Sequence, residues 1–237
     1  MQTDLFKTLN TISTFNCYTS WIHQNIRPYL SGNVLDIGSG IGDVAKHYLE
    51  DPGVSRVILS DGFDEMLSVL EQKFIQDRRV EVLRMNISDT ANIPAQLKKF
   101  FDSITCINVI EHIEDDVQAL KNMRDLLNER GNLVVMVPAI PAIYGTLDSL
   151  VGHYRRYTRR TFRDTALKAG FVVKRQFYMN MPGIVSWFIA GRILKRRQFD
   201  SVPCKTLDNV VPFIQFLEKC IKPPIGQSLI TVCGKLL

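Results

Sequence analysis

The chain has 237 residues, 46% hydrophobic and 22% charged, which is enough to bury one sizeable core and predicts a single domain over residues 1–237. No apolar run approaches the roughly 18 residues that span a bilayer, and the start M-Q-T-D-L-F-K lacks the apolar stretch of a secretory signal, so we expect a cytoplasmic protein. The net charge of +5 permits an anionic partner without requiring one. The five cysteines form no C-x-x-C pair, so we expect reduced thiols and no metal site.

A helical arm with aromatic residues is expected over residues 1–32, before the first strand. Short β-branched runs then alternate with amphipathic segments, and five of these runs are predicted strands: residues 33–37, 56–60, 80–84, 101–107 and 132–137. One intervening segment, Asp116 to Arg130, has apolar residues at helical spacing and is followed by Gly131. The alternation predicts an α/β protein with a doubly wound, mostly parallel sheet and helices on both faces.

Two more strands are expected in the second half of the chain. Thr158 is a suitable N-cap for a helix that ends at Gly170, and residues 171–178 follow as a sixth strand. The chain closes on a seventh strand over residues 228–236. The intervening residues 181–224 are apolar and helix-prone, which predicts a helical insertion that caps the sheet.

Three glycines at alternate positions, Gly38, Gly40 and Gly42, follow the first predicted strand. A glycine turn at this place, opening a helix, is where doubly wound sheets bind nucleotides. The dinucleotide fingerprint needs its third glycine one position later, where this chain has Asp43, so a pyrophosphate dinucleotide is disfavoured. Asp36 adds a carboxylate beside the loop, which suits a ligand with an ammonium or sulfonium group.

The segment L-D-I-G-S-G-I-G, from Leu35 to Gly42, resembles the first motif of class I S-adenosylmethionine-dependent methyltransferases. Asp61 ends the second strand, where the family has an acid that binds both ribose hydroxyls. Asn86 stands where an aspartate usually contacts the adenine amine, and N-V-I-E-H, starting at Asn108, is similar to the segment beside the methionine part of the cofactor.

The resemblance implies a Rossmann-like methyltransferase fold with seven strands, the last one antiparallel, and S-adenosylmethionine as cofactor. It also implies that the adenine packs on the side chain after Asn86. The cofactor-binding residues expected on this basis are Tyr18, Asp36, Gly38, Ser39, Gly40, Gly42, Asp61, Gly62, Asn86, Ile87, Asn108 and Val109.

Two histidines are candidates for the catalytic base. A hydroxyl acceptor, or a phenol that attacks through carbon, must lose a proton, and histidine is the natural group to take it. His112 follows the fourth strand, close to the expected methyl group, but it could instead only shape the cofactor pocket. His153 lies five residues after Asp148, whose carboxylate could orient the imidazole, although both could also belong to a lid whose polar residues bind only one another. His47, after the glycine loop, is expected at the surface.

His153 belongs to the segment Y-G-T-L-D-S-L-V-G-H-Y-R-R-Y-T-R-R, which resembles a pattern found in a broad group of bacterial methyltransferases. It follows the fifth strand, at the edge where substrates enter such sheets. Five arginines cluster at its end, and most are expected on a solvated face. One of the first two could clamp a carboxylate or phosphate through paired hydrogen bonds. The substrate-binding candidates are therefore Tyr144, Arg155 and Arg156.

A helix over residues 187–197 would be apolar at one end and cationic at the other. Such a helix suits a cover over the active site, a homodimer contact, or a peripheral contact with an anionic membrane. The length of the whole insertion favours a small or lipid-like acceptor over a folded RNA.

The sequence therefore predicts methyl transfer from S-adenosylmethionine to a small organic acceptor, at oxygen rather than at carbon or nitrogen. The acceptor is expected to be anionic or lipid-linked. One alternative is an RNA methyltransferase, but nucleic acid is disfavoured because the basic segment is its only support and no RNA-binding module is visible. The other alternative is a regulator that binds the cofactor without catalysis.

Overall fold

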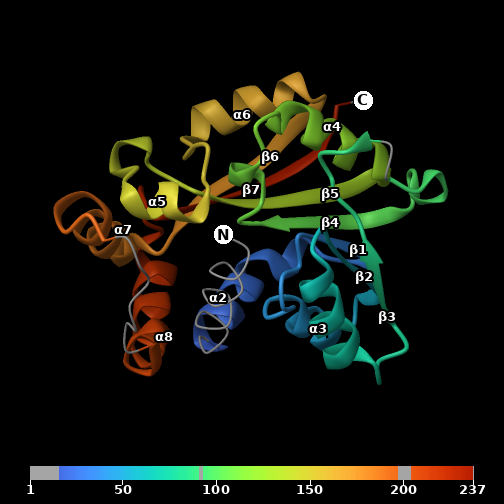
Figure 1. Cartoon of the computed structure of the whole chain (residues 1–237), viewed down its shortest axis with the longest axis horizontal. Helices are drawn as coiled ribbons and strands as arrows, with labels where there is room; N and C mark the ends of the chain where they lie inside the picture. The colour runs from blue at the N-terminus through green and yellow to red at the C-terminus, as the bar shows by residue number, and fades with distance from the viewer. Residues whose placement is uncertain (1–15, 91–92, 197–203, 237) are drawn as a thin grey trace.

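A single seven-stranded sheet organises the computed structural model, which describes residues 16–90, 93–196 and 204–236 (Figure 1). The strands lie in the order β3-β2-β1-β4-β5-β7-β6. Strands β1 to β5 pair in parallel, and β7 runs antiparallel to both β5 and β6, which confirms the predicted doubly wound fold. Their bounds are β1 Gly32–Ile37, β2 Val54–Asp61, β3 Val80–Arg84, β4 Phe101–Ile107, β5 Leu127–Pro138, β6 Phe171–Met179 and β7 Ser228–Lys235.

Alternate residues of the central strands face two separate cores. Leu35 of β1 joins the core that α4 and α6 cover, whereas Val34, its neighbour, joins the core beneath α2 and α3. Figure 1 shows these helix pairs on opposite faces of the sheet. The helices are α2 Asn16–Ile26, α3 Asp64–Phe74, α4 Asp116–Leu126, α5 Thr146–Val151, α6 Arg159–Lys168, α7 Met181–Phe188 and α8 Cys204–Ile221.

Two predicted elements differ from the structure. The helix expected over residues 116–130 ends at Leu126, because Leu127 is fully buried and pairs with Phe101 at the start of β5. Helical spacing alone could not show that the strand begins there. The segment after the glycine loop is a 3₁₀ helix, η2 Ala45–Glu50, rather than an α-helix.

Thr158 caps α6 as predicted, since its side chain accepts the N–H of Thr161 at 3.1 Å. The described part of the N-terminal arm is α2 and a 3₁₀ turn, η1 Arg27–Tyr29. Residues 1–15 of that arm, and residues 197–203 of the insertion, lie outside the described residues.

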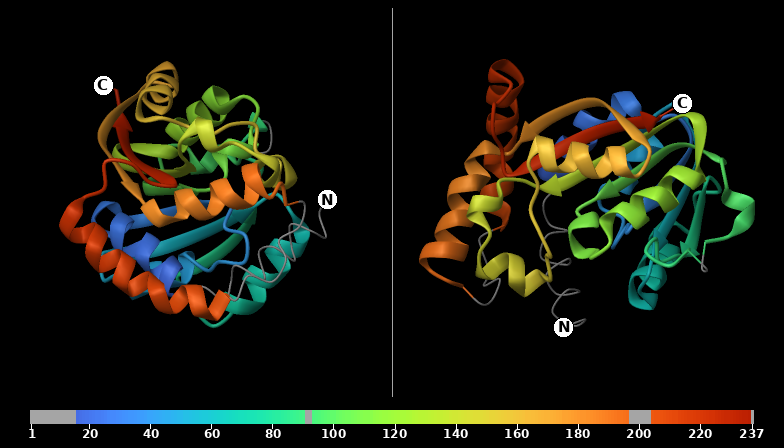
Figure 2. Two further views of the ribbon diagram at one scale, coloured as in Figure 1. Left: turned by 90° about the vertical axis from the view of Figure 1, so that its left-hand side faces the viewer. Right: turned by 90° about the horizontal axis from the view of Figure 1, so that it is seen from above.

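The insertion consists of α7, which continues into a π-helical turn, η7 Ile189–Ile193, and of α8 (Figure 2). Asp208 of α8 accepts the backbone N–H groups of Cys17 and Tyr18 at 3.0 and 3.3 Å, so the insertion is tied to the start of α2. Among the described helices, none combines the length and the apolar character that crossing a membrane requires.

Candidate active site

The glycine loop lies at the carboxyl end of β1 and packs against the end of β4. Gly38 has φ of +66°, and a Cβ there would come within 2.5 Å of a methyl group of Val109. The Ser39 N–H donates to Ser60 O at 2.9 Å, and its hydroxyl donates to Asp36 O at 3.1 Å. Gly42 has φ of +72° and also packs closely, because a Cβ there would meet Phe74 of α3 at 2.6 Å. The loop therefore needs glycine for its conformation and for its close contacts.

Asp61 connects the glycine loop to the end of β2. Its Oδ2 accepts the N–H of Gly40 at 3.0 Å, and its Oδ1 accepts that of Phe63 at 3.1 Å. Burial raises the pKa of the Asp61 carboxyl. A Cβ on the neighbouring Gly62 would meet nothing within 4 Å, so the chain leaves open space beside this carboxylate. The position fits the predicted contact with two ribose hydroxyls, since each carboxylate oxygen has a second lone pair.

Asp36 lies beneath the loop rather than beside it. Its side chain accepts the hydroxyl of Thr105 at 2.5 Å and that of Tyr48 at 3.3 Å, and the residue is 5% exposed. Burial raises the pKa of this carboxyl to about 6. Because Tyr48 and Thr105 already hold the group, its first role is to fix the loop on β4 and η2.

The two residues predicted for the adenine differ in exposure. Asn86 is exposed, and its amide oxygen accepts the N–H of Ser88 at 3.0 Å. Ile87 is only 3% exposed and belongs to the core under α4, where its carbonyl accepts Asn122 at 2.7 Å. This burial argues against the predicted contact between Ile87 and a ligand ring.

Two further predicted cofactor residues lie along the same sheet edge. Asn108 directly follows β4 in a left-handed conformation, with φ of +53°, and is exposed. Tyr18 extends from α2 to the start of β7, where its hydroxyl interacts with Ser228 and Asn180. It is therefore at the correct edge, but beside β7 rather than beside the glycine loop.

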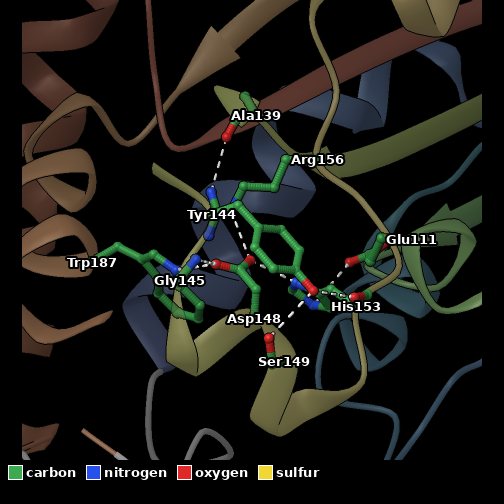
Figure 3. A network of polar contacts seen from close by, with 9 residues as sticks. All are labelled: Glu111, Ala139, Tyr144, Gly145, Asp148, Ser149, His153, Arg156 and Trp187. Carbon is green, nitrogen blue, oxygen red and sulfur yellow. Dashed lines mark hydrogen bonds and ion pairs between the residues drawn. The ribbon is translucent and has the colours of Figure 1, made fainter. Parts of the chain in front are cut away.

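His153 and Asp148 form a hydrogen-bonded pair in the segment after β5 (Figure 3). The His153 Nδ1 lies 2.9 Å from Asp148 Oδ1, and Asp148 is fully buried in α5. The same carboxylate accepts Arg156 Nε at 2.7 Å and Trp187 Nε1 of α7 at 3.0 Å. Burial acts to raise the pKa of Asp148, but the bonds from His153 and Trp187, with the charge of Arg156, hold it below its usual value. The carboxylate thus orients the imidazole, and its bond to Arg156 also fits the alternative of a segment whose polar residues bind one another.

Glu111 and His112 meet this pair from the end of β4. The Glu111 Oε1 lies 3.8 Å from His153 Nε2, and the two imidazole rings contact edge to face with centroids 4.7 Å apart. Burial raises the pKa of the Glu111 carboxyl to about 8. Burial and the adjacent His153 lower the pKa of His112 to about 4, so His112 is neutral at neutral pH. The sequence reading missed Glu111, although it lies inside the N-V-I-E-H motif.

The two arginines proposed to clamp a substrate are already engaged. Arg155 forms an ion pair with Asp116 at 2.9 Å and donates to Glu114 O at 2.7 Å. The Arg156 side chain is fully buried, where it binds Asp148 and donates to Ala139 O at 2.8 Å. Both guanidinium groups thus already have acceptors within the chain, whereas Arg159, Arg160 and Arg163 are exposed, as predicted for most of the five arginines.

Tyr144 and His47 also have defined partners. The Tyr144 hydroxyl donates to His153 O at 2.7 Å, so this side chain supports the loop that carries the histidine. His47 was predicted at the surface, and this prediction is wrong. Its side chain is 13% exposed, contacts Thr19 at 3.4 Å and stacks on His23 with ring centroids 5.5 Å apart.

Val109 connects the two halves of the site. Its side chain lies against Gly38, and its carbonyl accepts the N–H of His112 at 3.0 Å. The glycine loop and the His153 group thus share the carboxyl edge of the sheet, where ligands bind in doubly wound folds.

Comparison with known proteins agrees with this arrangement. Residues 16–176 match a family model described as a methyltransferase domain. The ubiquinone/menaquinone biosynthesis C-methyltransferase UbiE of Rickettsia bellii (strain OSU 85-389) is 27% identical over 139 residues, which are 56% of this chain and 56% of that protein. The chain therefore spans about half the length of the curated relatives it matches.

Solved structures share the fold at low sequence identity. YcgJ of Bacillus subtilis superposes with a TM-score of 0.61 at 16% identity, covering 91% of this chain and 97% of that one. A SAM dependent methyltransferase of Archaeoglobus fulgidus superposes with a TM-score of 0.58 at 19% identity, covering 92% and 94%.

Proposed function

Because the chain belongs to the methyltransferase domain family, we propose that it transfers a methyl group from S-adenosylmethionine to a hydroxyl oxygen of a small organic acceptor. The observation that carries the proposal is the His153–Asp148 pair beside the glycine loop. A hydroxyl attacks well only after losing a proton, and histidine, whose ordinary pKa lies near neutrality, is suited to take it.

The cofactor, when bound, supplies an electrophilic methyl group on a positively charged sulfur. In the proposal Gly38, Gly40 and Gly42 shape the loop that receives it, and Asp61 accepts the ribose hydroxyls. Exposed Asn108 and Asn86 lie along the same edge as further contacts. The remaining predicted contacts are Tyr18, Asp36, Ser39, Gly62 and Val109, with Ile87 left out because of its burial.

Asp148 determines which nitrogen of His153 acts as the base. With Nδ1–H donated to the Asp148 carboxylate, Nε2 keeps its lone pair and takes the acceptor proton. The imidazolium that forms is then stabilised by Asp148. His112 stays neutral beside it and fills the space between His153 and the end of β4.

Carbon is the second candidate for the methylated atom. The UbiE relative is a C-methyltransferase, and it matches this chain over 139 residues. A phenolate attacks through its oxygen or through a ring carbon, and both routes begin with the same loss of a proton to His153. The proposal therefore extends to phenolic or enolic acceptors in general, with oxygen as the first expectation.

The insertion supports an acceptor that is anionic or attached to a lipid. The outer faces of α7, η7 and α8 carry large exposed apolar side chains together with the cations Arg192 and Lys219. A face of this kind suits the interfacial region of an anionic membrane, where a lipid-linked acceptor would be found, and a homodimer would cover it as well. The exposed apolar residues are Val185, Phe188, Ile189, Ile193, Leu194, Val210, Phe213, Phe216, Leu217 and Ile221.

The test is incubation of the purified chain with methyl-labelled S-adenosylmethionine and a panel of phenols, enols and lipid-linked phenols. Label in a methyl ether identifies oxygen as the acceptor, and label that resists ether cleavage identifies carbon. His153→Gln should abolish the labelling, and Arg160→Gln, a change at a side chain that is 91% exposed, should leave it intact. If the chain binds the cofactor but labels no acceptor, a regulator is favoured. If it binds RNA in a salt-dependent way and labels it, an RNA methyltransferase is favoured.

A further inference from the structure

Glu111, His112 and His153 each direct one possible metal ligand to the same point, and these three ligand atoms lie within 4.8 Å of one another. We propose that they bind one divalent transition-metal ion, of the kind that two imidazoles and a carboxylate hold. This donor set is typical of Zn²⁺ and Fe²⁺ sites that keep further positions open. The sequence predicted no metal site because His153 lies far along the chain from the Glu111–His112 pair.

The Glu111 carboxylate is the first argument for a cation. The residue is fully buried, and among the described residues neither of its oxygens has a hydrogen-bond partner. Buried polar atoms without partners are rare because each one loses its water without compensation. A metal ion at this point would satisfy the carboxylate.

The second argument is the way in which His153 is held. Its Nδ1 is hydrogen-bonded to Asp148, which leaves the lone pair on Nε2. This Nε2 lies 3.8 Å from Glu111 Oε1. A carboxylate behind the far nitrogen of a histidine is the usual outer shell of a protein metal site. The 3.8 Å separation is already shorter than about 4.4 Å, twice the longest usual bond from zinc to nitrogen or oxygen.

The charge of the surroundings admits a divalent ion. Glu111 and Asp148 contribute two negative charges when ionised, and Arg156, which is paired with Asp148, contributes one positive charge. His112 adds no formal charge and offers one ring nitrogen as a ligand. A divalent ion would leave one net positive charge, which an anionic acceptor oxygen would neutralise.

Metal binding and base catalysis use the same lone pair of His153. Metal binding is independent of the proposed methyl transfer. The competition between metal and base, however, rests on that proposed function. One Nε2 cannot hold a metal and take up a proton at the same time, so the metal-loaded chain should lose the base-assisted transfer. Protons should also compete with the metal, because both bind at this nitrogen.

The test is a titration of the metal-free, tag-free chain with Co²⁺, followed by its visible absorption, with Zn²⁺ as competitor. We expect one Co²⁺ per chain, displaced by Zn²⁺. Glu111→Gln, which removes the charge at constant size, should abolish the bands. Asp148→Asn should weaken binding by roughly 10- to 100-fold. The matched control is Glu114→Gln, an exposed acid three residues after Glu111, which should bind Co²⁺ as the unaltered chain does.

S-adenosylmethionine affinity is measured on every variant, both as a check of folding and as a separate test of the proposed function. A chain that binds the cofactor but no Co²⁺ overturns the metal site and leaves the proposed function standing. Co²⁺ binding unchanged in Glu111→Gln overturns it as well. Co²⁺ bound without cofactor affinity supports the metal site and contradicts the methyltransferase proposal. If the metal-loaded chain transferred the methyl group faster, His153 would not be shared between metal binding and base catalysis as proposed.

Discussion

At the glycine loop, it is the backbone that faces the carboxyl edge of the sheet. In the segment after β5, side chains face this edge, and other side chains hold them in place. Gly38 and Gly40 are positioned by their own backbone and by one partner each, Val109 and Asp61. His153 depends on Asp148, which in turn is bonded to Arg156 and to Trp187 from a different element. If the glycine loop binds the cofactor and His153 acts as the base, as proposed, each region should tolerate changes that disable the other. Below, these two regions are the cofactor half and the catalytic half of the proposed site.

The largest expected effect is that of His153→Ala on turnover. A positioned acid–base group contributes about 10²- to 10⁴-fold to a rate, and turnover should fall within that range. Cofactor affinity, measured by calorimetry, should stay nearly unchanged, since in the proposal the histidine faces the acceptor. Normal turnover in this variant would remove His153 from the mechanism and break the division between the two halves.

Glu111→Gln should change how stability depends on pH. The folded pKa of about 8 is above the ordinary value of the carboxyl, 4.5, so the folded state binds the proton more tightly than the unfolded state. Glu111 therefore destabilises the protein as pH rises from about 5 to 8, by up to about 1.4 kcal/mol per pH unit. Chemical denaturation at several pH values should show this slope in the unaltered chain and a flatter one in Glu111→Gln. An equal slope in both would mean that Glu111 ionises normally.

Asp61→Ala tests the cofactor half. Removing this carboxylate should weaken S-adenosylmethionine binding by on the order of 1 to 3 kcal/mol, because two ribose hydroxyls lose a charged acceptor. The labelling rate at saturating cofactor should change little. Since Asp61 also accepts the N–H of Gly40, the matched variant Asp61→Asn shows how much of the loss comes from the loop itself. Unchanged affinity in both would mean that the ribose lies elsewhere.

The parts of this molecule that were predictable from sequence are those with local causes. Alternating patterns and turns predicted the seven strands and the mostly parallel, doubly wound sheet, and the spacing of three glycines indicated the nucleotide loop. The pairing of His153 with Asp148 was also visible, because the two lie in one short segment. By contrast, the helix predicted over residues 116–130 is longer than the observed one. Leu127 follows the helical pattern, yet it pairs with Phe101 in the sheet.

What the sequence could not show are contacts made across elements. His47 was expected at the surface, but α2 places Thr19 and His23 against it. Arg156 was read as a substrate clamp, but Trp187 and Asp148 enclose it. Glu111 has no local signal beyond its motif, and its burial beside His153 results from how the segment after β5 folds over the end of β4.

Thr158→Ala is expected to have the smallest effect, and it tests whether α6 supports the catalytic half. Losing the side-chain cap on the N–H of Thr161 should cost about 1 kcal/mol of stability, measured by chemical denaturation. Thr165→Ala, inside the same helix, should cost nothing. Turnover should remain normal, because Tyr157, immediately before the cap, is held independently by its backbone bonds to Pro138 and Ile140. A loss of turnover in Thr158→Ala alone would show that the start of α6 positions the side chains around His153.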